Sequence, residues 1–399
     1  PKPRLKNRRL IPKNQKRSNL KFGNSAPHRC AIFFRQPMTY LIDSHEDIAC
    51  SVLTFERDIC LSANETRLKE AGTQIPEWNK GEATLGWPDY QRGRVGLIFA
   101  TVFTAPAKFS GGDWDTMCFK DSVAAEKLMR AQFDYYHRLC SEHPDKFRLV
   151  LNQRDLHEVL QPWEEDLPGE HPVGLVLLME GADGLSSPRL LEEFHERGLR
   201  LVGPAWAGTR YFGGTKEDVP FDVETRALLD MMMQLKLPLD VSHMRESGIL
   251  AALDHYDGPV IASHANAIAL LKESPSFRHL TDSSIRRLYE RGAVIGAVPY
   301  NLFLSMEWNF GSPREMVTLK MFAEQIDYYC QMAGSSKFTG VGSDFDGGFG
   351  FPNIPLELDT IADLQKLGGV LKEMGYTPDD VDYIFHSNWK RQLETMLPA

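Results

Sequence analysis

The chain has 399 residues, of which 42% are hydrophobic and 25% are charged, and it carries a formal net charge of −9. This composition is typical of a globular protein and excludes extensive disorder and collagen-like repeats. No apolar stretch approaches the roughly 18 residues that a membrane-spanning helix needs, and the six cysteines are scattered without a CxxC pair. We therefore expect no membrane span, no disulfide framework and no structural zinc site.

The basic residues are unevenly distributed along the chain. Residues 1–42 hold 11 of the 45 Lys and Arg residues and no acidic residue, since Asp43 is the first carboxylate. Three interpretations of a basic N-terminal arm over residues 1–36 stay open: a flexible or extraneous extension, a transit peptide, and a nucleic-acid-binding arm. Nothing downstream offers a basic surface studded with aromatic residues, so we expect no nucleic-acid partner.

From about residue 38 onward, short apolar runs alternate with longer amphipathic segments. Runs rich in Val, Ile and Leu predict strands buried on both faces over residues 39–45, 95–103, 174–181, 199–206, 237–243, 259–266, 293–300 and 338–347. Helical spacing predicts helices over 122–139, 223–235, 283–291, 313–332, 361–374 and 379–396. Thr377 is the expected N-cap of the last helix, ahead of Pro378 in its first turn.

This alternation of strands and helices predicts a parallel sheet. Eight strands favour a closed (β/α)8 barrel, the TIM barrel, over an open doubly wound sheet. Neither a GxGxxG nor a GxxxxGK[ST] phosphate loop is present. We expect a single barrel domain over residues 37–399.

Residues that bind metals or transfer protons stand at the ends of five predicted strands. These ends are 43–47, 180–181, 242–243, 263–264 and 344–347. In a barrel they lie on one rim, the face on which active sites are built. A single histidine is more often a hydrogen-bonded core residue, but burying this many ionisable groups without a cation would cost several kcal/mol per uncompensated charge. The imidazoles and carboxylates together predict a site for zinc or a similar divalent metal.

The number of ligand-type residues indicates two ions, because a lone catalytic zinc uses about three protein ligands and a water. His45 and Asp47, two residues apart, can bind one ion, whereas His243 and His264 suit a second. Glu180 lies between these pairs in barrel order and could bridge both ions. Two such ions can share a water and lower its pKa towards neutrality.

Asp344 is then left over, in position to accept a proton from that water and return it to a leaving amine. Competing nucleophiles are not supported. The sequence has no GxSxG elbow, and Cys50, the cysteine nearest the rim, is expected to pack in the first helix.

These strand ends together resemble the renal (membrane) dipeptidase family of zinc metallopeptidases, within the amidohydrolase group of barrels. The resemblance runs from about residue 38 to 396. It rests on DSHEDIA (43–49), LMEGADGL (178–185), LDVSHM (239–244), VIASHANA (260–267), GVGSDFDGG (340–348) and a C-terminal segment over 375–393 with Asn388.

The resemblance implies a binuclear site and assigns Asp344 the proton-shuttle role. Its metal ligands would be His45, Asp47, Glu180, His243 and His264. The segment SPSFRHLTD (274–282) is similar to the family stretch whose arginine binds the free carboxylate of the substrate, which places that role on Arg278. A guanidinium is a two-pronged donor that suits a carboxylate; the alternative is a solvated surface arginine.

Trp206 departs from the pattern of the family. It stands where well-studied members have a histidine that polarises the scissile carbonyl, and an indole N–H can donate a hydrogen bond but cannot become cationic. Glu46 replaces the usual Asn between His45 and Asp47 and is expected to point away from the metals. Tyr300, at the end of the seventh strand, is a candidate wall of the substrate pocket.

We therefore expect a metal-dependent dipeptidase in which a hydroxide bridging two divalent ions, most simply Zn²⁺, attacks the peptide bond. Two alternatives stay open: the same chemistry on another small amide, ester or lactone, and a non-catalytic barrel. The expected partner is a dipeptide, and a homodimer stays open as the assembly. No targeting signal is convincing, so the cytoplasm is the expected compartment.

Overall fold

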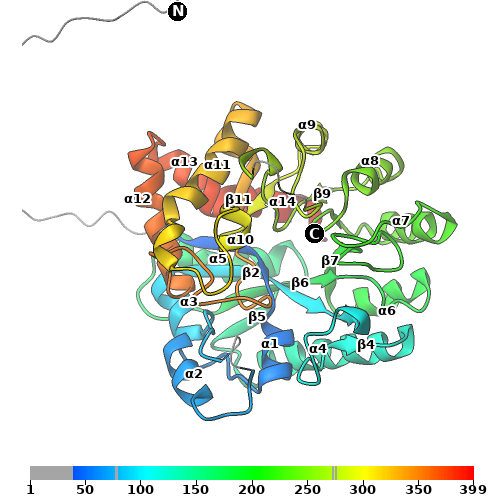
Figure 1. Ribbon diagram of the computed structural model, residues 1–399, viewed down its shortest axis with the longest axis horizontal. Helices are drawn as coiled ribbons and strands as arrows, with labels where there is room; N and C mark the ends of the chain where they lie inside the picture. The colour runs from blue at the N-terminus through cyan, green and yellow to red at the C-terminus, as the bar shows by residue number, and fades with distance from the viewer. Residues whose placement is uncertain (1–38, 77–79, 272–273, 275) are drawn as a thin grey trace, which may run out of the picture. The chain divides into compact units, whose positions relative to one another are not determined.

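Eight parallel strands form the centre of the fold and follow one another around it in chain order (Figure 1). The computed structural model describes residues 39–76, 80–271, 274 and 276–399. The predicted basic arm, residues 1–36, lies outside the described residues. The barrel strands are β1 Leu41–Glu46, β2 Val95–Phe103, β6 Val173–Glu180, β7 Leu199–Gly203, β8 Leu239–Asp240, β9 Val260–Ile261, β10 Ile295–Ala297 and β11 Thr339–Val341.

The ladder of strand pairs runs β10-β11-β1-β2-β6-β7-β8-β9. A parallel bridge between Ala262 and Ile295 closes the remaining gap between β9 and β10. The eight predicted strands and the TIM barrel are thereby confirmed. Three short strands lie outside the barrel path. They are β3 Ala105–Pro106 and β4 Cys118–Phe119, which pair with each other, and β5 Phe147–Leu149, which pairs with the start of β6.

The connecting segments form the helices that surround the strands (Figure 1). They are α1 Ile48–Phe55, α2 Ala63–Glu70, α3 Trp87–Gly93, α4 Ser122–Glu142, α5 Gln153–Glu164, α6 Leu191–Glu196, α7 Val223–Leu235, α8 Glu246–His255, α9 Asp282–Glu290, α10 Asn301–Leu304, α11 Leu319–Ala333, α12 Lys366–Glu373, α13 Pro378–Asp382 and α14 Asn388–Met396. Among the helices of the described chain, none is long and apolar enough to cross a membrane.

Most predicted helices are confirmed, but three differ from the sequence prediction. The segment predicted over 361–374 begins as a 3-10 helix, Ile361–Gln365, and becomes α-helical only at Lys366. The helix predicted over 313–332 begins only at Leu319, because Val317 and Thr318 are extended and the Val317 carbonyl accepts a hydrogen bond from Leu356 N. The helix predicted over 379–396 is continuous, but its middle, η7 Tyr383–Ser387, is π-helical. Thr377 caps its start, as predicted, by accepting from Asp380 N.

Two glycines let the barrel strands approach closely just below the rim. A Cβ atom on Gly296 would lie 2.0 Å from the Ser263 carbonyl oxygen, and one on Gly342 would lie 1.9 Å from it. The Ser44 hydroxyl fills the adjacent space, 2.5 Å from the Ser263 oxygen and 2.9 Å from the Val341 oxygen. The segment that carries His264 is therefore held against β1 and β11.

Replacing Gly342 by Ala tests this close approach. The added methyl must displace backbone, so we expect Gly342→Ala to lower the free energy of unfolding by about 3 kcal/mol. Gly369→Ala is the control, since nothing lies within 4 Å of its Cβ position on the exposed face of α12. It should raise the free energy of unfolding by about 0.5–1 kcal/mol. Urea titrations measure both, and equal stability of the two variants would contradict the assignment.

Candidate metal centre and substrate pocket

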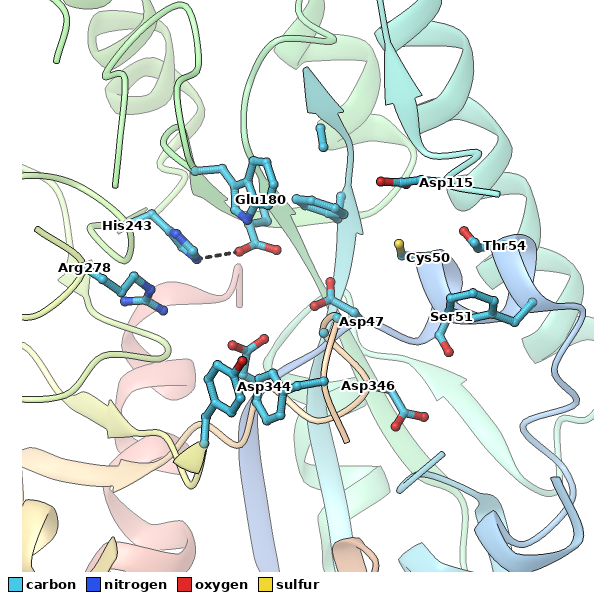
Figure 2. A pocket seen from close by; sticks show the side chains of 18 of the residues that line it. Asp47, Cys50, Ser51, Thr54, Asp115, Glu180, His243, Arg278, Asp344 and Asp346 are labelled. Carbon is cyan, nitrogen blue, oxygen red and sulfur yellow. Dashed lines mark ion pairs between the residues drawn. The ribbon is translucent and has the colours of Figure 1, made fainter. Parts of the chain in front are cut away.

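Ligand-type side chains from four strand ends meet at one rim of the barrel. Figure 2 shows three of them, Asp47, Glu180 and His243. His45 lies in β1 and Asp47 directly after it, Glu180 is the last residue of β6, and His243 and His264 follow β8 and β9. The ends of parallel strands share one edge, which is why residues more than 200 positions apart converge. All five side chains are buried or nearly so.

The carboxylate of Glu180 lies between two sets of imidazoles. Its Oε2 atom is 3.4 Å from His45 Nε2. Its Oε1 atom is 3.0 Å from His243 Nε2 and 3.5 Å from His264 Nε2. Each carboxylate oxygen therefore faces a different set of ring nitrogens.

These donor atoms fit divalent metal ions. In a tetrahedral zinc site with bonds of about 2.1 Å, two ligand atoms lie about 3.4 Å apart. The Nε2 atoms of His243 and His264 are 2.9 Å apart. His45 Nε2 is buried without a hydrogen-bond partner and lies 3.9 Å from Asp47 Oδ2. An orphaned ring nitrogen facing carboxylate oxygens is the arrangement that a cation completes.

The buried carboxylates at the rim also favour a positive charge close to them. Burial raises the pKa of Asp344 well above its usual range, and the nearby Asp47 and Glu180 carboxylates add to the effect. Burial disfavours the charged form of His45, but Glu180, Asp47 and Asp344 outweigh it and raise the pKa of His45 to about 10. Burial lowers the pKa of His243 to about 4, which keeps that imidazole neutral and able to bind a metal.

Asp344 lies beside this cluster, with Oδ1 3.9 Å from His45 Nε2. Its backbone N–H donates to the His45 carbonyl. Both Asp344 and His243 adopt left-handed backbone conformations, with φ of 58° and 66°. Non-glycine residues in that region commonly mark functional sites, where surrounding structure maintains the strain.

A pocket with a cavity volume of about 250 Å³ opens beside the cluster, and Figure 2 shows side chains that line it. Arg278, one of its lining residues, is 4% exposed. Its Nη2 atom donates to the His264 carbonyl at 2.7 Å, whereas Nε and Nη1 are buried without hydrogen-bond partners. A buried guanidinium with two unused donors is suited to an anionic ligand.

Trp206 and Tyr300 also line the pocket. The Trp206 ring packs edge-on against Phe103, with ring centroids 5.0 Å apart, and lies 6.4 Å from the His243 ring. Tyr300 stacks on Phe349 at 3.9 Å, and burial raises the pKa of its hydroxyl. Both residues predicted near the substrate are therefore brought to the pocket.

The sequence analysis missed one end of this pocket. Asp115 lies in the long β2–β6 connection and lines the pocket with Cys50 of α1, across the cluster from Arg278 (Figure 2). Burial raises the pKa of the Cys50 thiol well above its usual range, so it is a poor nucleophile. Glu46 points away from the cluster, as expected, and accepts a hydrogen bond from the Tyr90 hydroxyl.

The sequence analysis also missed Asp240, the last residue of β8. It is 2% exposed and lies close to His45 and His264. An acidic residue inside the apolar run LPLDV was the available signal, but it was read as part of the strand rather than of the site.

Comparisons with known proteins show what this chain is similar to. A model of the membrane dipeptidase family, peptidase family M19, matches residues 36–396. An uncharacterised protein of Klebsiella pneumoniae, from the 5′ region of pqqA, is 30% identical over 279 residues, which cover 67% of this chain and 96% of that protein. The dipeptidase tcpJ of Claviceps purpurea is 25% identical over 316 residues, or 76% of this chain and 67% of that protein.

Solved structures share the fold. A dipeptidase of family M19 is 22% identical, covers 91% of this chain and 100% of that chain, and superposes with a TM-score of 0.70. A Rhodobacter sphaeroides metallopeptidase, solved with a phosphinate mimic of the dipeptide L-Ala-D-Ala, is 21% identical with a TM-score of 0.70. That match covers 90% of this chain and 99% of the other.

Metal removal tests the donor set. Without a cation, Asp47, Glu180 and Asp344 repel one another in a buried site, so chelation should lower the melting temperature. Restoring Zn²⁺ at 100 times its dissociation constant should stabilise the fold by about 2.7 kcal/mol per site. Differential scanning calorimetry of the chelated and reloaded protein measures the change. If neither chelation nor zinc addition changed the melting temperature, a metal at this cluster would be excluded.

Proposed function

Since the chain belongs to the membrane dipeptidase family, peptidase family M19, it is a metal-dependent dipeptidase, and we propose that its metal centre holds two zinc ions. His45 and Asp47 would bind one ion, and His243 and His264 the other. Glu180 would bridge them. The observation that carries this proposal is the position of Glu180, whose Oε2 faces His45 at 3.4 Å while Oε1 faces His243 at 3.0 Å.

The choice of zinc follows from the donors. Three imidazole nitrogens and two carboxylates form a borderline-soft set that suits zinc better than calcium or magnesium. When bound, the two ions lower the pKa of water and polarise the carbonyl oxygen of the scissile peptide bond. The protein itself then has to hold the dipeptide in place and move one proton.

Asp344 is the residue proposed to move that proton. Its carboxyl group lies at the edge of the cluster, with Oδ1 3.9 Å from His45 Nε2. Asp344 is 8% exposed, and a buried carboxyl group beside the ligands is of the type that accepts and returns a proton in general acid–base catalysis. We propose that Asp344 takes a proton from the attacking water and delivers it to the departing amine.

Arg278 is proposed to bind the free carboxylate of the dipeptide. Nε and Nη1 have no hydrogen-bond partner and lie on different edges of the guanidinium, so one of them, together with the second hydrogen of Nη2, forms the pair that matches the two oxygens of a carboxylate. With the carboxylate held there, the peptide bond reaches the metal ligands and the N-terminal residue extends towards Trp206 and Phe103. A pocket of about 250 Å³ admits little more than two residues, which supports an activity limited to very short peptides.

Trp206, in place of a histidine, affects both the rate of hydrolysis and the choice of dipeptide. An indole N–H can donate one hydrogen bond, but unlike a histidine it cannot carry a positive charge next to the carbonyl oxygen. Phe103 and Phe109 pack edge-on against the ring, with ring centroids 5.0 and 6.0 Å from it. We propose that Trp206 serves mainly as an apolar wall for the N-terminal residue of the dipeptide, and that Tyr300 forms the facing wall.

Asp344→Asn tests the proton shuttle. An amide cannot accept and return a proton, so we expect kcat on dipeptides to fall by about 10²–10⁴-fold while metal content stays near two ions per chain. Asp346→Asn is the matched control, because that carboxylate lines the same pocket but accepts hydrogen bonds from Thr84 N and Oγ1. It should change kcat by only a few-fold. Steady-state kinetics with elemental analysis decide the matter, and full activity of Asp344→Asn would remove the role.

Arg278→Gln tests the carboxylate contact when a dipeptide is compared with its C-terminal amide. A hydrogen bond to a charged group contributes about 1.5–3 kcal/mol, so kcat/KM for the free acid should fall by about 10–100-fold. The value for the amide should hardly change, since it lacks the carboxylate. An equal loss on both substrates would mean that Arg278 acts only through its contact with the His264 carbonyl.

A further inference from the structure

One hydroxyl group contacts a histidine from each half of the proposed metal centre. Ser263 Oγ lies 3.2 Å from Nδ1 of His45 and 2.8 Å from Nδ1 of His264. These are the ring nitrogens turned away from Glu180. Ser263 Oγ also lies 2.5 Å from Asp240 Oδ2. All four residues are buried, with exposed fractions of 2% or less.

The proton positions follow from counting donors and acceptors. A hydroxyl has one proton and two lone pairs. The Asp240 carboxylate can only accept, so the Ser263 proton points to Asp240 Oδ2. The Ser242 hydroxyl lies 3.3 Å away but directs its own proton to Asp240 Oδ1 at 2.8 Å. Both lone pairs of Ser263 Oγ are then left to accept N–H bonds from His45 and His264. Each ring must therefore carry a proton on Nδ1, and in the neutral form that a metal requires this leaves Nε2 unprotonated and free to bind it.

Asp240 itself is not available as a metal ligand, although it lies within reach of both rings. Its Oδ1 atom accepts from Ser242 N at 3.0 Å, from Ser242 Oγ at 2.8 Å and from Ser263 N at 2.9 Å. Together with the bond from Ser263 Oγ, four donors occupy a carboxylate that has about four acceptor sites. The network also ties the end of β8 to the end of β9.

The third imidazole is supported separately. His243 Nδ1 lies 3.3 Å from Thr215 Oγ1, in the segment that follows β7. Among the described residues, that hydroxyl bonds to His243 and to neither His45 nor His264. Thr215 therefore supports one histidine, whereas Ser263 supports two that are assigned to different ions.

We propose that Asp240 and Ser263 form a single positioning unit that holds both His45 and His264 as Nδ1–H tautomers and so couples the two metal sites. This inference rests on the proposed binuclear centre. Neither residue touches substrate or metal. Their effect is to fix which nitrogen of each ring faces the cations, and a defect in either one should weaken both sites together.

Substitutions at the two positions act through different chemistry. Ser263→Ala removes the shared acceptor and leaves two buried N–H groups without partners, so both rings can turn or change tautomer. In Asp240→Asn, an NH2 group placed at Oδ2 would donate to Ser263 Oγ and turn the serine proton towards an imidazole. Placed at Oδ1, it would face three donors. Neither orientation of the amide reproduces the native pattern.

The test compares metal affinity in four variants of the full chain. Ser263→Ala and Asp240→Asn should each bind both zinc ions about 10–100-fold more weakly than the native protein. Thr215→Val should weaken one ion only. Ser242→Ala is the matched control: it removes a buried serine hydroxyl that bonds to Asp240, accepts from His264 N and lies 3.3 Å from Ser263 Oγ, but contacts no Nδ1 atom. Both rings keep the Ser263 acceptor in this variant, so both affinities should stay within about 3-fold of native. Competition with a chromophoric chelator measures both binding steps.

Proton NMR of the zinc-loaded protein separates tautomer control from a purely structural role of Ser263, because it detects the protons on Nδ1 directly. The exchangeable Nδ1–H resonances of His45 and His264 should both be lost in Ser263→Ala and retained in Ser242→Ala. Urea unfolding of the metal-free variants checks that each one folds. If Ser263→Ala is too unstable to study, Asp240→Asn keeps the same volume and carries the test alone.

The outcomes separate this inference from the proposed function. A native protein that binds fewer than two ions would overturn the binuclear centre, and with it the coupling. Two ions in the native protein, bound equally tightly by Ser263→Ala or lost from one site only, would overturn the coupling and leave the dipeptidase proposal intact.

Discussion

The site depends on one buried carboxylate held between imidazoles. Glu180 is 5% exposed, and its two oxygens face His45 on one side and His243 and His264 on the other. Burying a charge without partners costs several kcal/mol, so these residues are stable together only when positive charge lies between them. Three features bring positive charge and these carboxylates together. They are the convergence of the strand ends, the left-handed turns at His243 and Asp344, and the buried guanidinium of Arg278.

The barrel provides rigidity where the ligands need it. β8 and β9 are only two residues long, so strand pairing alone would hold His243 and His264 weakly. Side-chain hydrogen bonds add to the strand pairing that holds these two histidines. The Asp240 carboxylate connects the two strand ends, and the Ser44 hydroxyl meets the Ser263 carbonyl where glycines on β10 and after β11 leave room for it. Hydrogen bonds below the rim thus hold His45 and His264, whereas Thr215, in the segment that follows β7, supports His243.

The pocket divides into two ends of different character. At one end, Arg278 offers unused donors; at the other, aromatic rings and Asp115 surround the space beyond the metal ligands. A small zwitterionic substrate matches this polarity, since its carboxylate and its N-terminal residue lie on opposite sides of the peptide bond. Trp206 adds apolar surface to the pocket between Phe103 and His243.

The sequence alone determined the barrel and the set of ligand-type residues. Buried parallel strands are continuous apolar runs, so ionisable residues such as His45, Glu180 and His264 stand out at their ends, and the parallel topology brings those ends to one rim. Only the tertiary structure decided how Asp240 and Ser263 are used and which loop closes the pocket at Asp115. Those features depend on strand register and on the direction of each side chain. Neither leaves a periodic pattern in the sequence, because the contacts join residues from different strands and loops.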